Sequence, residues 1–416
     1  MKALTISALL LTAALAAAPE AMGQPLRREV FTTLRGAVPY RIPAIATAKN
    51  GDLIAVADYR YSGGDIGTGK IDLRYSRSHD NGATWSPAAT LVAGADFTDT
   101  TTYMHTGFGD PCIVADRKSS RMLLLSCSGA VMFPYGTRHH HQGIARFYSD
   151  DNGATWSAPT DISEAIYSLF DSSKIGAPRS MFVGSGRIFQ SSTVKAGKYF
   201  RLYCSVLYKD VNGVNKNYVL YSDDFGGTWA VLGGIDTAPI PQGADEPKVE
   251  ELPDGSILCS SRCTGGRLYN VFHFTNSRKA RGSWGEMAFS GAKNGGVAAE
   301  ANACNGEVMV VAAKRKSDGK RVSLLLQSVP LGPGRTNVGI YYKELASRAD
   351  YANPAAIATA WNGVYRVSNI GSAYSTMTLQ SDHAIGFLYE ESTHGADYTI
   401  VYERLPIELI TAGKYK

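Results

Sequence analysis

The chain has 416 residues and a net charge of +5, from 42 Lys or Arg residues against 37 Asp or Glu residues. So small a charge, spread without a basic cluster, argues against a nucleic-acid-binding protein. After about the first 20 residues, no stretch is long and apolar enough to span a bilayer. The 43 Gly and 23 Tyr residues, with 19% charged residues, are typical of a turn-rich β protein.

The first predicted element is a signal peptide over residues 1–23. Met1 and Lys2 form a charged start, an apolar run covers residues 3–18, and small residues follow before Gln24. This order is typical of secretory signals, and the run is too short for a membrane anchor. We place the cleavage point within residues 16–23. We therefore expect an exported protein, periplasmic or secreted, whose residues 24–416 form a single catalytic domain.

Short strands between Gly, Asp or Asn turns fill the rest of the chain. In chain order we predict strands over residues 44–46, 53–57, 71–75, 122–125, 187–191, 218–221, 257–260, 308–313, 322–326, 384–389 and 398–402. Asn50 and Gly51 between the first two strands are a strong hairpin signal. Helical periodicity is confined to residues 163–170 and 355–361, and it is weak in both. The pattern predicts an all-β fold.

Three near-identical octapeptides divide the chain. They begin at Ser78, Ser149 and Ser222, which are 71 and 73 residues apart, and they share the pattern S-x-D-x-G-x-T-W. A decayed fourth copy covers residues 277–284. Asp and Gly favour a tight turn, and the Trp carries a large apolar area inward. We interpret each copy as a hairpin turn pinned to the core. The alternative is a calcium loop, which usually needs more oxygen ligands and a distal Glu.

Many short strands with a long repeat favour radial repetition. A mature chain of about 390 residues, at roughly 65 residues per blade, accommodates six blades. The repeat is longer than the ~40–45 residues of a WD40 blade. We therefore predict a six-bladed β-propeller of four-stranded antiparallel blades, with the octapeptides at the outer hairpins of three blades.

Three arginines lie beside strand-core residues. Arg41 follows Tyr40 at a strand start, Arg262 ends the run 256–262, and Arg335 follows a Gly-Pro-Gly turn. A buried Arg is unfavourable unless it is paired. The three could form separate salt bridges, or they could cluster to bind a carboxylate, whose two oxygens match the guanidinium fork. The residues alone leave both interpretations open.

The motifs fall in an order that resembles the bacterial exo-α-sialidases (neuraminidases). They are Tyr-Arg-Ile-Pro at 40–43, the three octapeptides (Asp boxes), Glu-Pro-Lys-Val-Glu-Glu-Leu-Pro-Asp-Gly at 246–255, Gly-Pro-Gly-Arg-Thr-Asn-Val at 332–338, and Tyr-Ser-Thr-Met at 374–377 with Leu-Tyr-Glu at 388–390. Asp boxes occur in other secreted propellers too, so the order of all five motifs carries the resemblance. The family usually has Phe-Arg-Ile-Pro; the change to Tyr keeps the Arg.

The resemblance implies a six-bladed propeller that hydrolyses terminal sialic acid from sialylated glycans, needs no cofactor or metal, and acts as a monomer. It implies that Tyr374 is the nucleophile and that Glu246 is its base partner. Glu250 and Glu251 are alternatives to Glu246, which lies 16 residues before Arg262, close to the spacing in the family.

Asp65, in a Gly-rich loop, is similar to the acid/base of the family. Asp72 is the alternative, but it lies within a predicted strand. Arg60 and Asp110 resemble residues near the 4-hydroxyl and N-acetyl side of the sugar.

Arg41, Arg262 and Arg335 resemble the arginine triad that binds the sialic acid carboxylate. Arg315 and Arg321 are alternatives for the third place. Glu390 resembles the carboxylate that orients the first arginine of the triad.

The implied reaction is retaining and passes through a covalent tyrosyl-sialosyl intermediate, because a neutral Tyr hydroxyl avoids repulsion by the carboxylate of the sugar. A trans-sialidase would use the same residues. A sialic-acid-binding propeller without catalysis would not need Tyr374, Glu246 and Asp65 together.

Two residue types outside these motifs have structural interpretations. Residues His139, His140 and His141 are adjacent and cannot all face one metal ion, so we expect a solvated loop. Six cysteines lie in apolar runs without Cys-x-x-Cys pairs, which favours free buried thiols over disulfides: Cys112, Cys127, Cys204, Cys259, Cys263 and Cys304.

Overall fold

The computed structural model describes residues 25–96, 105–300 and 303–416. The signal peptide expected at residues 1–23 lies outside them. None of the helices in the described part of the chain has the length and apolar character needed to cross a membrane.

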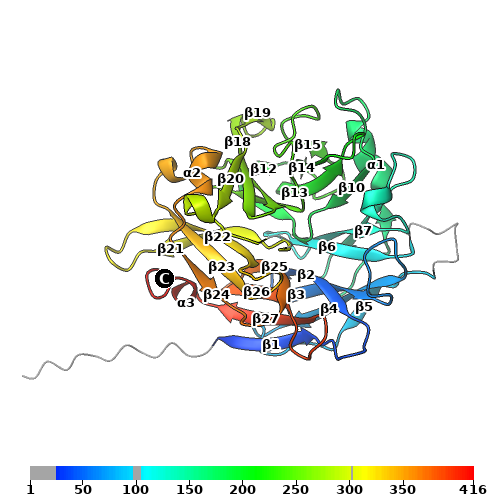
Figure 1. The fold of residues 1–416 in the computed structure, drawn as a ribbon, viewed down its shortest axis with the longest axis horizontal. Coiled ribbons are helices and arrows are strands. Elements are labelled where there is room, and N and C mark those ends of the chain that lie inside the picture. Colours follow the sequence, from blue (N-terminus) through cyan, green and yellow to red (C-terminus); the bar gives the residue numbers. More distant parts are fainter. Residues whose placement is uncertain (1–24, 97–104, 301–302) are drawn as a thin grey trace, which may run out of the picture.

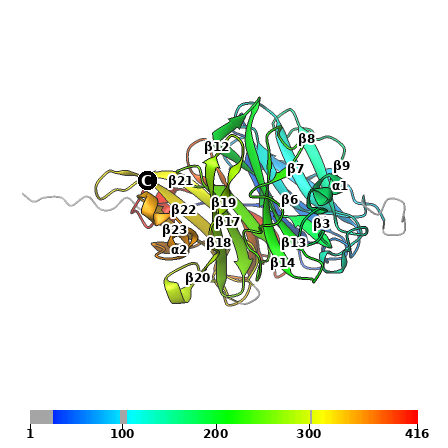
Figure 2. The same cartoon turned by 90° about the horizontal axis from the view of Figure 1, so that it is seen from above.

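The strands of the described residues form six sheets around a common centre (Figures 1 and 2). The first three blades contain β2 (Tyr40–Thr47), β3 (Leu53–Arg60), β4 (Ile71–Ser78) and β5 (Ala89–Val92); β6 (Phe108–Ala115), β7 (Met122–Ser128), β8 (Gly143–Ser149), β9 (Thr160–Asp161) and β11 (Gly186–Arg187); and β10 (Ser180–Val183), β12 (Phe189–Ala196), β13 (Tyr199–Lys209), β14 (Asn215–Ser222) and β15 (Ala230–Val231).

The other three blades complete the ring. They contain β16 (Pro247–Glu251), β17 (Ile257–Cys263), β18 (Gly266–Asn276), β19 (Arg281–Trp284) and β20 (Ala288–Gly291); β21 (Val308–Lys314), β22 (Arg321–Pro330), β23 (Val338–Leu345) and β24 (Gly363–Arg366); and β25 (Ser372–Leu379), β26 (Ile385–Glu391), β27 (Thr399–Leu405) and β1 (Leu26–Phe31). The six-bladed propeller predicted from the sequence is confirmed.

Blades 2, 3 and 4 depart from the predicted four strands by having a fifth. In blades 3 and 4 the reason is a long strand of 11 residues, β13 or β18, one edge of which pairs with two short strands in succession. In blade 2 the extra strand is β11, which pairs in parallel with β6. Strand lengths of this kind depend on long-range pairing and cannot be read from local periodicity.

The N-terminal strand closes the ring. Leu26 pairs with Arg404, so β1 forms the outer edge of the last blade beside β27, as Figure 1 shows. The first and last segments of the described chain therefore stabilise one another, and only the complete propeller has a paired final blade.

Helices are few and short. The helix predicted over residues 163–170 is α1 (Ser163–Tyr167) followed by the 3₁₀ turn η3 (Ser168–Phe170). The one predicted over 355–361 is α2 (Pro354–Ala358), capped by the Asn353 side chain and ending before Trp361. Elements too short to show a period were missed: α3 (Ile407–Ile410), η2 (Phe133–Tyr135), η4 (Ala292–Asn294) and η5 (Arg348–Asp350).

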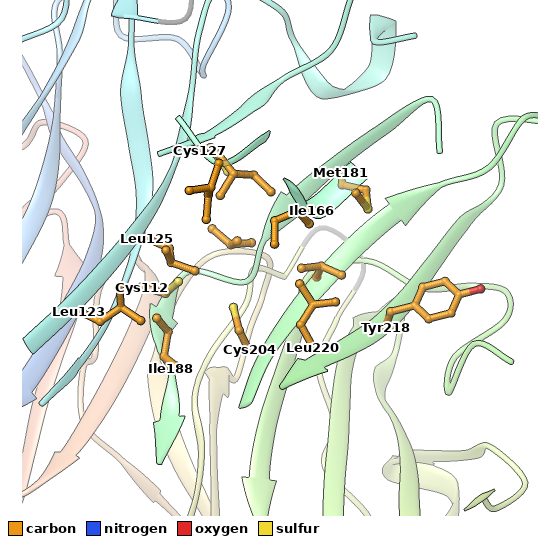
Figure 3. Packing of buried hydrophobic residues seen from close by; sticks show 14 of the residues in the cluster. Cys112, Leu123, Leu125, Cys127, Ile166, Met181, Ile188, Cys204, Tyr218 and Leu220 are labelled. Atoms are coloured by element: carbon orange, nitrogen blue, oxygen red, sulfur yellow. The ribbon is translucent and has the colours of Figure 1, made fainter. Parts of the chain in front are cut away.

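The core lies between neighbouring blades. Figure 3 shows the cluster between blades 2 and 3, where Cys112, Cys127 and Cys204 lie among aliphatic side chains. All six cysteines are free; five are buried and Cys263 is half-buried, as predicted. These thiols act as small apolar residues of the core.

Each Asp box uses its own polar groups to close a hairpin. In the first box, Ser78 Oγ donates to Asp80 Oδ1 (2.8 Å) and accepts from the Gly82 N–H (2.8 Å). Thr84 donates to the two oxygens of Asp80 through its N–H (2.9 Å) and its Oγ1 (2.6 Å). The boxes at residues 149–156 and 222–229 repeat these bonds. The carboxylate therefore serves the turn, which supports the structural interpretation.

The boxes also join each blade to the preceding one. A tyrosine of the preceding blade donates to a box carbonyl at 2.9–3.1 Å in all three cases: Tyr402 to Asn81, Tyr75 to Ala154, and Tyr148 to Phe225. Gly82 has φ 88°, and a Cβ there would lie 2.0 Å from the Tyr402 ring. Only Gly permits this approach. The decayed copy at 277–284 keeps a hairpin between β18 and β19 without the Asp bonds.

We expect Trp156→Ala to destabilise the propeller without affecting catalysis. Trp156 is half-buried against the cluster between blades 1 and 2 that contains Ile54 and Phe147. Loss of a half-buried Trp should lower the free energy of unfolding by about 2 kcal/mol, less than the fully buried case. Urea unfolding measures this, with Leu34→Ala, at a position 56% exposed, as control. An unchanged unfolding midpoint combined with lost substrate affinity would contradict the scaffold role.

We expect the free energy of unfolding to fall between about pH 4 and pH 2, because the aspartates of the Asp boxes become protonated. Hydrogen bonds from Thr84 and then Ser78 lower the pKa of Asp80 to about 2. Burial alone would raise the pKa of Asp151, but hydrogen bonds, chiefly from Thr155, lower it to about 2. These folded-state values lie below the ordinary ~3.9 of Asp, so the stabilisation is present above that pH and is lost as pH falls through the folded pKa. Urea unfolding at several pH values should show a shallower acid loss in Asp80→Asn. A loss as steep as in the original chain would contradict this role.

Candidate active site

Seven of the predicted site residues line one cavity of about 430 Å³. Four of them lie on strands: Arg41 on β2, Asp110 on β6, Arg262 on β17 and Tyr374 on β25. Glu246 directly precedes β16. Asp65 lies on the loop between β3 and β4, and Arg335 on the loop between β22 and β23. Residues 333 positions apart in the chain thus share one site, because the inner ends of the blades converge. No Asp-box residue is among those that line it.

Irregular backbone directs several of these side chains. Strands β2, β6 and β25 each shift register near their first residues. In β2 the irregularity includes Ile42 (φ 50°) before Pro43, and in β6 it includes Asp110 (φ 50°) before Pro111. A bulge rotates the side chains at a strand end relative to the regular pleat. Pro43 and Pro111 fit such a bulge, because proline has no N–H to donate to the neighbouring strand.

Tyr374 and Glu246 are hydrogen-bonded. The Tyr374 hydroxyl donates to Glu246 Oε1 at 2.7 Å, and Arg262 Nη1 donates to Glu246 Oε2 at 2.7 Å and to the Tyr374 oxygen at 3.3 Å. Burial raises the pKa of Tyr374 well above its usual value; the Glu246 carboxylate raises it further and Arg262 opposes this. The hydroxyl is therefore protonated at neutral pH, and Glu246 is the adjacent base that can accept its proton.

Glu390 is fully buried and organises the first arginine. Its Oε1 accepts from Arg41 Nε at 2.8 Å and from the Ile42 N–H at 2.8 Å, and its Oε2 accepts from the Tyr374 N–H at 3.2 Å. The Arg41 guanidinium also lies 4.9 Å from the centroid of the Tyr398 ring. Glu390 thus sets the orientation of Arg41 and the backbone at Tyr374 together.

Three guanidinium groups line the cavity that contains the Tyr374 side chain. Arg335 lies with its guanidinium 5.7 Å from the Tyr374 ring centroid, while Arg41 and Arg262 line the same cavity. Such a cluster can bind a carboxylate with directed N–H donors. Of the two alternative arginines, Arg315 pairs with Glu344 outside the cavity, and Arg321 lines a different groove, together with residues 312–314, 382–384 and 406–408.

Arg60 lies behind the cavity rather than in its wall. It is 1% exposed and is held by Asp58, with Nη2 2.7 Å from Asp58 Oδ2. Its other contacts are an ion pair with Asp65 and a 3.8 Å approach to Asp110. The Asp65 side chain is 75% exposed, on a loop that contains four glycines. Arg60 is therefore not among the residues that line the cavity.

The alternative carboxylates serve other parts of the fold. Glu250 pairs with Arg187 in the buried centre of the propeller. Glu251 accepts from Ser191 Oγ at 2.6 Å, which joins blades 3 and 4. Asp72 pairs with Arg74 and lies outside the cavity wall.

Part of the cavity wall was missed by sequence reasoning. It includes Ile66, Met132, Phe133, Pro134, Gln142, Phe182, Leu207, Lys209 and Asn215. Phe133 and Phe182 meet edge to face with centroids 5.1 Å apart, and Lys209 Nζ lies 5.1 Å from the Phe133 ring centroid.

The expectation for the adjacent histidines was partly wrong: His139 and His140 are exposed, but His141 is buried and stacks on Tyr167, with ring centroids 3.7 Å apart. A ring partner distant in sequence gives no local signal.

Comparisons with known proteins agree with this arrangement. Residues 51–385 match the family described as BNR repeat-like domain. The chain is 26% identical to a sialidase of Micromonospora viridifaciens over 89% of its own length and 53% of the relative, and 25% identical to a sialidase of Clostridium perfringens over 84% and 86%. It thus spans about half the length of the first of these relatives.

Solved structures have the same fold. An intramolecular trans-sialidase from Ruminococcus gnavus superposes with a TM-score of 0.67 at 18% identity, covering 92% of this chain and 98% of the other. A Trypanosoma rangeli sialidase superposes with a TM-score of 0.66 at 19% identity, covering 94% and 60%. With the family match over most of the chain, these likenesses lead to one conclusion: the protein belongs to the BNR repeat-like family and, within it, to the bacterial sialidases with a six-bladed propeller.

Proposed function

We propose that the protein is a retaining exo-α-sialidase that releases terminal sialic acid from sialylated glycans. The observation that carries the proposal is the 2.7 Å hydrogen bond from the Tyr374 hydroxyl to Glu246 inside a cavity lined by three arginines. A Tyr–carboxylate pair next to a carboxylate-binding cluster suits a sugar whose anomeric carbon carries a carboxylate.

In the proposed reaction, the arginine cluster binds the substrate carboxylate and places the anomeric carbon beside Tyr374. Glu246 takes the hydroxyl proton as the Tyr374 oxygen attacks, and Asp65 protonates the departing glycosidic oxygen. A tyrosyl-sialosyl intermediate results. Water, deprotonated by Asp65, then displaces the Tyr374 oxygen, and Glu246 returns the proton. Two inversions give net retention.

The part of the cavity wall that contains Phe133 and Phe182 supports the assignment to a large sugar. It adds apolar surface to the cavity that the three arginines line. Asp65, on its glycine-rich loop, is placed to approach the glycosidic oxygen once substrate fills the cavity.

The test is a panel of linkage-defined sialosides followed by proton NMR of the released sugar, with and without lactose. The α anomer of free sialic acid should appear first. Release of the β anomer would contradict retention, and absence of turnover with measurable binding would show a lectin-like propeller. Transfer to lactose, or an anhydro sugar, would indicate a trans-sialidase with the same residues.

We further propose that the protein is exported, on the strength of the charged start and apolar run in residues 1–23. N-terminal sequencing of the protein from the culture should give a mature chain that begins near residue 24. A chain that retains Met1 in the cytoplasm would contradict export.

A further inference from the structure

Asp58 lies beneath the cavity and has no role in the reaction proposed above. It is on β3 and is fully buried. Its Oδ2 accepts from Arg60 Nε (2.9 Å) and Nη2 (2.7 Å), and its Oδ1 accepts from the Asp110 N–H at 3.0 Å. One carboxylate therefore fixes groups from two blades.

Strand β6 of the next blade packs closely against Asp58. A Cβ at Gly109 would lie 2.9 Å from Asp58 Oδ2, so the adjacent strand approaches as closely as its backbone allows. Asp58 and Arg60 are 0% and 1% exposed. A buried charge pair of this kind is retained only where each charge has its partner.

Arg60 faces three carboxylates at once. Besides Asp58 it contacts Asp65 and approaches Asp110. The positive charge of the Arg41 guanidinium repels that of Arg60. Only Asp65 of the three is largely exposed, and only Asp65 is on a loop. Arg60 therefore connects the buried interior to the residue that we assign as acid/base.

This contact conflicts with the task of an acid. Asp65 must be neutral to donate a proton, whereas a nearby cation favours the anion. Burial acts to raise the pKa of Asp65, but Arg60 first, and then Arg41 and Arg335, lower it below its usual range. The stronger the unbalanced charge of Arg60, the harder Asp65 is to protonate.

We propose that Asp58 is a positioning residue that holds Arg60 and offsets its charge, so that Asp65 can take up the proton that it must deliver to the leaving group. The proposal rests on the proposed function, because it requires Asp65 to be the acid. It adds a residue that lies outside the cavity wall and acts on Asp65 through Arg60.

The test compares two leaving groups in Asp58→Asn. An aryl sialoside with a 4-nitrophenyl group departs without protonation, whereas sialyllactose needs the acid. We expect kcat/KM for sialyllactose to fall about 100-fold and that for the aryl sialoside to fall less than about tenfold. Equal losses for the two substrates, or unchanged sialyllactose hydrolysis, would overturn the proposal. A merely structural defect gives equal losses.

Asp72→Asn is the matched control. Asp72 is also a buried aspartate, 2% exposed, on the next strand, and it also pairs with an arginine two residues later, Arg74 at 2.7 Å. Its replacement should affect the two substrates equally. If it shifts the ratio as Asp58→Asn does, the effect does not come from Arg60 and the proposal is wrong.

A double variant covers the case in which Asp58→Asn alone fails to fold. Asp58→Asn with Arg60→Gln removes both members of the buried pair, and removing both is far milder than removing one. Without the guanidinium, sialyllactose hydrolysis relative to aryl sialoside hydrolysis should return to within about threefold of the original ratio. A selective loss as large as about 100-fold in the double variant would overturn the proposal.

Activity of the unmodified protein separates the proposed function from the role of Asp58. If the unmodified protein hydrolyses neither sialoside, the proposed function is wrong. If it hydrolyses both and Asp58→Asn reduces both equally, the function stands and only the role of Asp58 is wrong.

Discussion

Tyr374→Phe is expected to lower kcat by at least about 10³-fold while leaving the fold intact. The substitution keeps the buried ring and removes the one oxygen that donates to Glu246 at 2.7 Å. Glu246 keeps its hydrogen bond from Arg262, so no buried charge loses its partner. We therefore expect a large effect on kcat and a small effect on the free energy of unfolding. Hydrolysis of an aryl sialoside and thermal unfolding measure the two quantities.

The matched control is Tyr389→Phe. Tyr389 is buried in blade 6, and its hydroxyl donates to Glu403, also at 2.7 Å, away from the cavity. This variant should be slightly less stable and keep its kcat/KM. Full activity in Tyr374→Phe would remove the nucleophile from the mechanism; equal losses in the two variants would point to packing rather than chemistry.

Arg335→Ala is expected to lower kcat/KM by about 10²–10³-fold, mostly through KM. Truncating one partner of a charge pair that excludes water weakens binding by about 3–4 kcal/mol. The Arg335 guanidinium lies 5.7 Å from the Tyr374 ring centroid, where it would pair with the substrate carboxylate. Steady-state kinetics with sialyllactose at several salt concentrations measures the effect. The catalytic pair of Tyr374 and Glu246 remains in place, so kcat should change less than KM.

Arg315→Ala provides the control for Arg335→Ala. Arg315 also follows an apolar strand, but it pairs with Glu344 and Asp318 on the surface. Its removal should leave kcat/KM unchanged. A loss of activity in Arg315→Ala, with Arg335→Ala unaffected, would reverse the assignment of the third arginine.

The Asp boxes illustrate how far local patterns reach. Ser78, Asp80, Gly82 and Thr84 satisfy one another within a few residues, so their spacing alone specifies the turn. What the pattern cannot show is that Gly82 contacts Tyr402. That contact joins the first blade to the last and exists only once the ring has closed.

The candidate site shows the same division. Arg41, Tyr374 and Glu246 stand in recognisable motifs, and the choice of Glu246 over Glu250 agrees with the geometry, because only Glu246 lines the cavity. Asp58 stands in no motif. It follows directly after the predicted strand 53–57, and its significance arises from Arg60 and from a backbone N–H of another blade.

Composition, strand periodicity and motif order were sufficient to determine the all-β class, the number of blades, the hairpin turns and seven of the residues in the cavity wall. These properties depend on contacts within about ten residues of the chain or on a repeat that the chain displays directly. The tertiary structure alone decided which strands pair with two partners along one edge, where Arg60 lies, how Asp58 connects β3 to β6, and which further residues line the cavity. Each of these depends on groups far apart in sequence, and their proximity is set by how six blades pack around one axis.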